Sequence, residues 1–141
     1  MNLFPQLSDE SKVWIYQSQT ELSDEQKVGM QQSMNSFVEG WAAHGSGLFA
    51  EATILEDYFL VFAVDESKAK ASGCSIDSSV RFVKQLQEKL NLDFFNRLNV
   101  LVEIDGAKKI VSYHELDALP SKTQFNLLAK NLGELRRSWR I

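Results

Sequence analysis

The segment over residues 58–64 restricts the fold most, because it is apolar at every position. Alternate residues of a strand point to opposite faces of its sheet. One face of this strand would carry Tyr58, Leu60, Phe62 and Val64, and the other would carry Phe59, Val61 and Ala63. A strand that is apolar on both faces belongs in the middle of a sheet that is covered on both sides.

The composition is that of one folded domain. The chain has 141 residues, of which 44% are hydrophobic and 24% are charged, values typical of a globular protein with its own core. No repeat, low-complexity segment or linker divides it, so we expect a single domain over residues 1–141. The net charge is -4, whereas nucleic-acid-binding proteins usually show a basic face. The basic residues at 136–140 fit the end of a terminal helix, and we expect no nucleic-acid partner.

Targeting signals are also lacking. No apolar segment approaches the length of a membrane span, and residues 1–5 do not resemble the start of a secretory signal. The single cysteine, Cys74, cannot form a disulfide within the chain. We therefore expect a cytoplasmic protein that does not bind membranes. No complete cofactor motif is present, so we expect no cofactor.

Helix and strand signals alternate along the chain. Ser23 and Gln26 have the spacing of a capping box, and the apolar residues that follow share one helical face. A second helix is predicted over about residues 77–90. Strands are predicted at 12–18, 48–55, 58–64, 98–104 and 110–113, with tight turns at Glu56-Asp57 and Asp105-Gly106. The remaining segments are a short helix at 114–119, a strand at 123–129 and a helix that is capped by Asn131.

This order predicts an α+β fold with a mainly antiparallel sheet. Its front half, β-α-β-β-α-β, matches the split βαβ arrangement of ferredoxin-like folds, in which the first and third strands are central. A hairpin strand, a further strand and a helix complete the chain. Trp14, Tyr16, Phe59 and Val61 indicate that the second face of the sheet is covered. Either the C-terminal segment folds over this face, or two copies pair through it as a homodimer.

The stretch over residues 40–47 has the glycine spacing of a phosphate-binding loop but lacks the lysine that contacts the phosphates. It also closes a predicted helix, whereas a phosphate loop opens one. We interpret it as a helix end followed by a turn. Complete hydrolase and dinucleotide-binding motifs are absent as well.

The best candidate for chemistry is Cys74, which lies where an extended segment is predicted to become a helix. The exposed N–H groups at a helix start favour a thiolate. A thiol enzyme also needs a base, which His44 could supply, and a carboxylate to orient it, such as Asp77, Asp65 or Glu66. No metal-ligand spacing accompanies Cys74, so we expect no metal site.

Ordinary folding roles explain the same residues, and we favour that interpretation. Cys74 would be a small buried apolar residue, Ser75 or Asp77 would cap the second helix, and His44 would complement the end of the first. His114 fits a surface or junction position. The predicted function is a non-catalytic protein that binds an unidentified small molecule or protein near loops 44–47 and 72–77. Its contact residues would include Gly45, Ser46, Ser72, Gly73 and Ser75, and a thiol-dependent enzyme or redox-responsive protein using Cys74 is the alternative.

Several segments together resemble an uncharacterised bacterial family whose members often carry the label "ABC transporter ATPase". They lie at residues 14–18, 41–45, 64–66, 72–77 and 94–97, and the resemblance covers most of the chain. The family brings no established activity, substrate or catalytic residue to these positions. The label itself requires a phosphate loop, and residues 40–47 do not form one.

Overall fold

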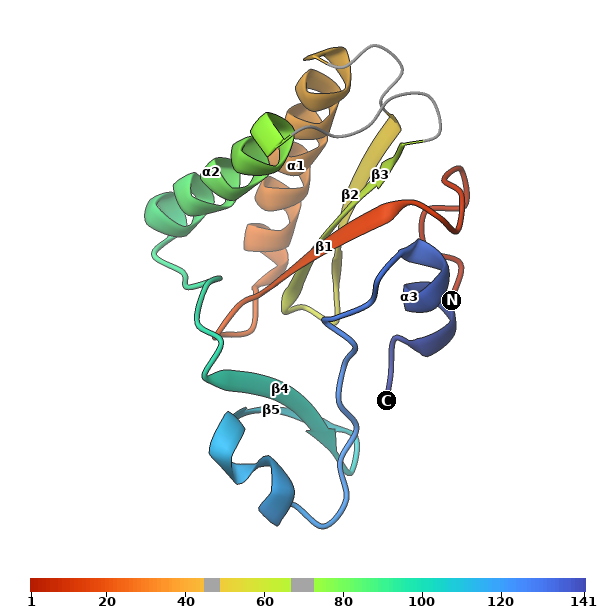
Figure 1. Ribbon diagram of the computed structural model, residues 1–141. Helices are drawn as coiled ribbons and strands as arrows, with labels where there is room; N and C mark the ends of the chain where they lie inside the picture. Colours follow the sequence, from red (N-terminus) through yellow and green to blue (C-terminus); the bar gives the residue numbers. More distant parts are fainter. Residues whose placement is uncertain (45–48, 67–72) are drawn as a thin grey trace.

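The computed structural model describes residues 1–44, 49–66 and 73–141 (Figure 1). The fold is α+β, as predicted. Its elements are β1 (Lys12–Gln17), α1 (Asp24–His44), β2 (Phe49–Leu55), β3 (Phe59–Asp65), α2 (Gly73–Leu90), β4 (Asn99–Ile104), β5 (Ala107–Ser112), the 3-10 helix η1 (Tyr113–Ala118) and α3 (Leu132–Ser138).

The main sheet has three strands in the order β1-β3-β2, and both neighbouring pairs are antiparallel. The prediction that the apolar segment over residues 58–64 is central is confirmed, because β3 lies between the other two strands. β1 was expected to be central and instead lies at an edge. β4 pairs with β5 in a separate two-stranded sheet, so the ferredoxin-like arrangement is not confirmed.

Each face of β3 packs against its own hydrophobic cluster, and Phe59 to Val64 are all fully buried. α1 and α2 cover one face, where Met34 and Val83 pack with Phe62. The N-terminal segment and α3 cover the other face, on the opposite side of the sheet in Figure 1. The C-terminal segment therefore provides the second layer, which was one of the two predicted alternatives. Tyr58 joins this second cluster, so its predicted alignment with Leu60 was wrong.

Local signals fixed the caps and turns. Ser23 and Gln26 exchange hydrogen bonds of 2.9 and 3.1 Å between backbone N–H and side-chain oxygen, which confirms the capping box. Glu56 and Asp57 both have positive φ, as a tight hairpin turn requires. The side chain of Asn131 accepts a hydrogen bond from the Glu134 N–H at the start of α3, which confirms the predicted cap.

Two predicted boundaries were wrong. α2 begins at Gly73, so Ser75 and Asp77 lie inside the helix and do not cap it. Residues 123–129 form no continuous strand, because their pairing is limited to isolated bridges that join Thr123 to Glu103 and Phe125 to Arg140. An extended sequence pattern cannot distinguish a full ladder from single bridges between loops.

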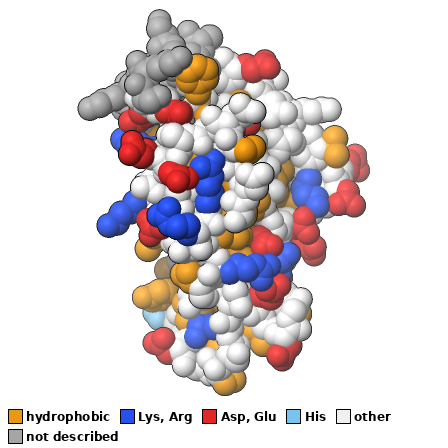
Figure 2. Space-filling model, turned by 90° about the vertical axis from the view of Figure 1, so that its right-hand side faces the viewer, with side chains coloured by type: hydrophobic (Ala, Val, Ile, Leu, Met, Phe, Trp, Pro, Cys, Tyr) orange, Lys and Arg blue, Asp and Glu red, His pale blue; other side chains and the backbone are white. Residues whose placement is uncertain are grey.

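The arginines of the C-terminal segment bind specific partners. The guanidinium of Arg136 donates to the carbonyl groups of Leu3, Phe4 and Leu7 and to the carboxylate of Asp9. Arg140 forms ion pairs with Glu56 and Glu103. These contacts, rather than the end of the helix, explain two of the basic residues. On the face of the molecule in Figure 2, positive and negative side chains are interspersed.

Three helical glycines differ in what a methyl group would meet. An added Cβ at Gly29 or Gly40 of α1 has no neighbouring atom within 4 Å, whereas at Gly133 it would lie 2.8 Å from the Asp9 Cβ. We expect Gly29→Ala and Gly40→Ala each to raise the free energy of unfolding by about 0.5–1 kcal/mol, because alanine loses less backbone entropy. Gly133→Ala should lower it by about 1–3 kcal/mol through overpacking. Urea unfolding followed by circular dichroism measures all three, and a stabilised Gly133→Ala variant would contradict this packing.

Among the described residues, no helix is both long and apolar enough to span a membrane. Both long helices contribute buried apolar residues to the cluster that packs on the sheet.

Candidate functional site

The residues predicted to act together include the last residue of α1 and the first turn of α2. His44 is the last residue of α1, and Gly73 to Asp77 form the first turn of α2. Gly45, Ser46 and Ser72 lie outside the described residues, as do the side chains of His44, Cys74 and Ser75. The Asp77 side chain is exposed to solvent.

Two of the carboxylates proposed to orient His44 lie at the end of β3, where Asp65 is the last residue of the strand and Glu66 follows it. Glu66 forms an ion pair with Lys12, with 3.5 Å between the carboxylate and the ammonium nitrogen, and Asp65 also has an interaction partner. Glu66 is therefore paired with a residue of β1, the edge strand. The described residues contain no cluster of three metal-ligating side chains. His114 is exposed in η1 beside Tyr113, which fits a surface histidine.

A groove runs between α1 and α2 in the described part of the molecule. One portion, of about 350 Å³, is lined from α1 by Glu25, Gln26, Gly29, Met30 and Ser33, and from α2 by Leu86, Lys89 and Leu90. A second and shallower portion, of about 480 Å³, is lined by Gln32, Ser33, Ser36, Phe37 and Phe82. Because Ser33 lines both portions, we treat them as one feature, the α1–α2 groove.

The groove exists because small residues of α1 face large residues of α2. Gly29, Ser33 and Ser36 recur at spacings of four and three, which places them along one side of α1. Phe82 and Leu86 form the opposite wall. Small side chains cannot fill the space between two helices whose other residues hold them on the sheet, and a hollow remains.

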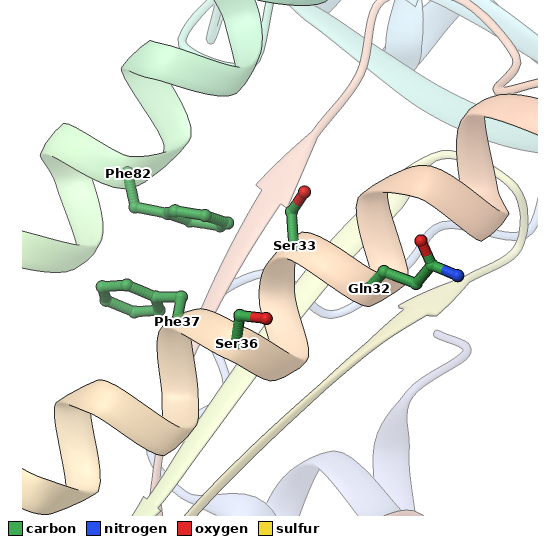
Figure 3. Close-up of a pocket in the computed structure, with 5 residues that line it drawn as sticks. All are labelled: Gln32, Ser33, Ser36, Phe37 and Phe82. Carbon is green, nitrogen blue, oxygen red and sulfur yellow. The ribbon is translucent and has the colours of Figure 1, made fainter.

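Two stacked phenylalanines bridge the helices at one end of the groove (Figure 3). The rings of Phe37 and Phe82 have centroids 4.6 Å apart and are inclined by 15°. Both rings also make edge contacts with Phe62 of β3, which is fully buried. The stack is therefore anchored to the sheet, while both phenylalanines remain partly exposed to solvent.

Charged side chains stand at the opposite end of the groove. Glu25 lies in the first turn of α1 and Lys89 in the last turn of α2. Within the described part of the chain, neither belongs to an ion pair, whereas Lys27 contacts both Asp24 and Asp57. This end of the groove therefore carries one negative charge, on Glu25, and one positive charge, on Lys89.

The groups with perturbed ionisation lie outside the groove. The hydrogen bond from Lys27 lowers the pKa of Asp57 and raises the pKa of Lys27 itself. Burial raises the pKa of Tyr16 and of Tyr58. The hydrogen bond to Glu103 raises the pKa of Arg140. Shifted pKa values often mark catalytic groups, but none of these five described side chains lines the groove. Its described lining is suited to contact with an apolar surface and not to proton transfer.

No family model, curated protein or solved structure matches the chain. The resemblance to an uncharacterised bacterial family therefore stays a prediction. Sequence reasoning missed the α1–α2 groove. The signal was the recurrence of the small residues Gly29, Ser33 and Ser36 at helical spacing along α1.

Proposed function

We propose that the protein is a non-catalytic binding module and that the α1–α2 groove is its binding site. The partly exposed stack of Phe37 and Phe82 carries this proposal, because aromatic rings that are fixed in place and accessible supply binding energy at little entropic cost. The surrounding serines and glutamines would orient a ligand without competing for its apolar part. This site occupies the same two helices that carry His44 and Cys74 at their other ends.

The lining argues for binding and against catalysis. An enzyme site brings a nucleophile or general base within hydrogen-bond reach of a partner that activates it. The ionisable side chains that line the groove are Glu25 and Lys89, and they form no ion pair within 4.0 Å of each other in the described chain. The groove thus resembles a recognition surface in its chemistry.

A solvatochromic dye tests this proposal. The probe is 1-anilinonaphthalene-8-sulfonate, whose fluorescence rises when it leaves water for an apolar site. The native protein should enhance the dye fluorescence, and Gly29→Trp should remove most of that enhancement by filling the groove. A Cβ added at Gly29 meets no neighbouring atom within 4 Å and Gly29 is exposed to solvent, so we expect the variant to fold.

Gly40→Trp is the matched control. Gly40 lies in the same helix with equally open surroundings, but it does not line the groove. The enhancement should persist in this variant. Equal fluorescence in the native protein and in Gly29→Trp would place the dye elsewhere and refute the assignment of the site.

The second candidate is a thiol-dependent or redox-responsive protein. The observation that favours it is the start of α2 at Gly73, since a first-turn thiol is in the position where helix N–H groups stabilise a thiolate. The rate of Cys74 alkylation against pH, in folded and denatured protein, separates the candidates. An activated thiol would label faster when folded and titrate below about pH 8, and a slower folded thiol would exclude activation.

A further inference from the structure

We propose that the occupant of the α1–α2 groove is an amphipathic helix of about three turns from a partner protein. This inference rests on the proposed function, since it names the kind of partner that the groove recognises. A helix that lays its apolar face into a groove is a recurrent mode of peptide recognition. Three features of the groove favour it: openness, length and charge.

The groove is open along its side. Gly29, Gln32 and Ser36 line it and are all exposed to solvent. Small-molecule sites usually enclose most of the ligand surface, and a hollow with an exposed wall cannot do so. An elongated partner that covers the opening as it binds suits this shape better.

The groove is also long and has a continuous apolar wall. Its lining along α1 runs from Glu25 to Phe37, which is about 18 Å at 1.5 Å per residue and corresponds to about twelve residues of helix. Along α2, Phe82, Leu86 and Leu90 recur every four residues. The small side chains of Gly29 and Ser33 on the facing wall allow close approach of another helix.

The charges give the partner a polarity. Glu25 and Lys89 stand on opposite walls at the same end of the groove and lack ion-pair partners in the described chain. A helix between these walls meets Lys89 on one flank and Glu25 on the other. The complementary partner has an apolar stripe with an acidic residue beside α2 and a basic residue beside α1.

The probe for this inference is a library of random 16-residue peptides displayed on phage. Selection uses the native full chain, with prior removal of phage that bind Gly29→Trp. We expect the enriched peptides to carry apolar residues at i, i+3 or i+4, and i+7, with an acidic residue flanking the stripe. Synthetic copies should bind Gly29→Trp at least tenfold more weakly than the native protein and should bind Gly40→Trp normally.

A charge reversal then tests the polarity. Lys89→Glu should weaken the selected peptides by about two- to fivefold, the range of an exposed ion pair, and a peptide with lysine in place of its acidic residue should recover that loss. Lys84→Glu, on the exposed side of α2, is the control and should leave binding unchanged. Should Gly29→Trp not fold, Ser33→Trp replaces it.

Several outcomes would overturn the inference. A helical partner would be excluded if the enriched peptides lack helical periodicity or if no peptide is enriched over the Gly29→Trp background. Equal binding of the peptides to Gly29→Trp and Gly40→Trp would exclude it as well. Sedimentation of the native chain tests for self-association. A second copy of the chain as the occupant of the groove would also exclude a helix from a partner protein. Dye binding that depends on Gly29 while no helical peptide is selected would refute this inference and leave the proposed function standing.

Discussion

Replacing Arg136 by methionine should lower the free energy of unfolding by about 3 kcal/mol. The guanidinium is largely buried, with 18% of the side chain exposed. It bonds Asp9 at 2.6 Å and three carbonyl oxygens of the N-terminal segment at 2.5 to 2.9 Å. Hydrogen bonds to a charged group contribute about 1.5–3 kcal/mol each, although the freed carbonyl groups would recover part of this by binding water.

The loss should extend beyond the bonds themselves. Phe4 has a positive φ of 50°, which is an unfavourable backbone conformation for a bulky residue, and its carbonyl is one of those that Arg136 holds. Leu3 and Leu7, whose carbonyl groups Arg136 also holds, are buried in the second cluster. Without the guanidinium, the N-terminal segment should detach more readily and expose these side chains.

Arg137→Met is the matched control, because Arg137 is the neighbouring residue and is exposed. It should change stability by less than about 0.5 kcal/mol. Arg136→Lys should fall between the two, since an ammonium group cannot reproduce the planar fork of a guanidinium. Urea unfolding gives the free energies, and limited proteolysis reports release of residues 1–9. Equal stability of Arg136→Met and Arg137→Met would show that the hydrogen bonds of Arg136 do not hold the N-terminal segment in place.

Gln17→Ala should be nearly as damaging, at about 2–3 kcal/mol. The Gln17 amide donates to the Asn99 carbonyl at 3.2 Å and accepts from the Leu101 N–H at 3.1 Å, so one side chain joins β1 to β4. Gln17 is 7% exposed and Leu101 is 2% exposed. Truncation leaves a buried N–H without a partner, which costs about 1–3 kcal/mol, and it also removes packed atoms.

The loss of stability in Gln17→Glu should depend on pH. A carboxylate can still accept from Leu101, but it cannot donate to Asn99 and would be buried with its charge. Burial raises the pKa of such a carboxyl in the folded state. Folding then favours the protonated form, so the deficit relative to the native protein should shrink as the pH falls toward about 5. Gln85→Glu, at an exposed position, should show no such trend. Parallel pH profiles for the two variants would contradict the role of Gln17 in joining β1 to β4.

Much of the local structure could be predicted from the sequence because short-range physics determines it. The Ser23 cap, the turn at Asp105 and the cap at Asn131 each depend on contacts within a few residues. The burial of β3 was also predictable, since an apolar strand with no polar face has only one stable place in a sheet.

The arrangement of β4 could not be predicted in the same way. Its alternating pattern suits the edge of the main sheet as well as it suits a separate hairpin. Gln17 occupies the β4 edge near Asn99, and Thr123 bonds Glu103 on the same strand. These are contacts between distant parts of the chain, and no local pattern reports them. The hydrogen bonds from Arg136 to the N-terminal segment could not be predicted for the same reason.

The groove was not predicted from the sequence. Sequence reasoning selected the ends of the two long helices, which include His44 and Cys74, but it did not detect the groove between the helices. A groove depends on where the helices cross, and hydrophobic periodicity indicates only which face of each helix is buried. The weak signal was the recurrence of small residues opposite Phe82.

The position of α3 has a consequence for biosynthesis. Leu132, Leu135 and Trp139 complete the layer over Phe59 and Val61, yet they are translated long after the strands that they cover. A nascent chain with α1 and α2 already docked would expose Phe59 and Val61 to solvent until residues as far as Arg140 leave the ribosome. Chaperones should therefore engage this protein late in translation, and a premature stop codon ahead of α3 should yield an insoluble product.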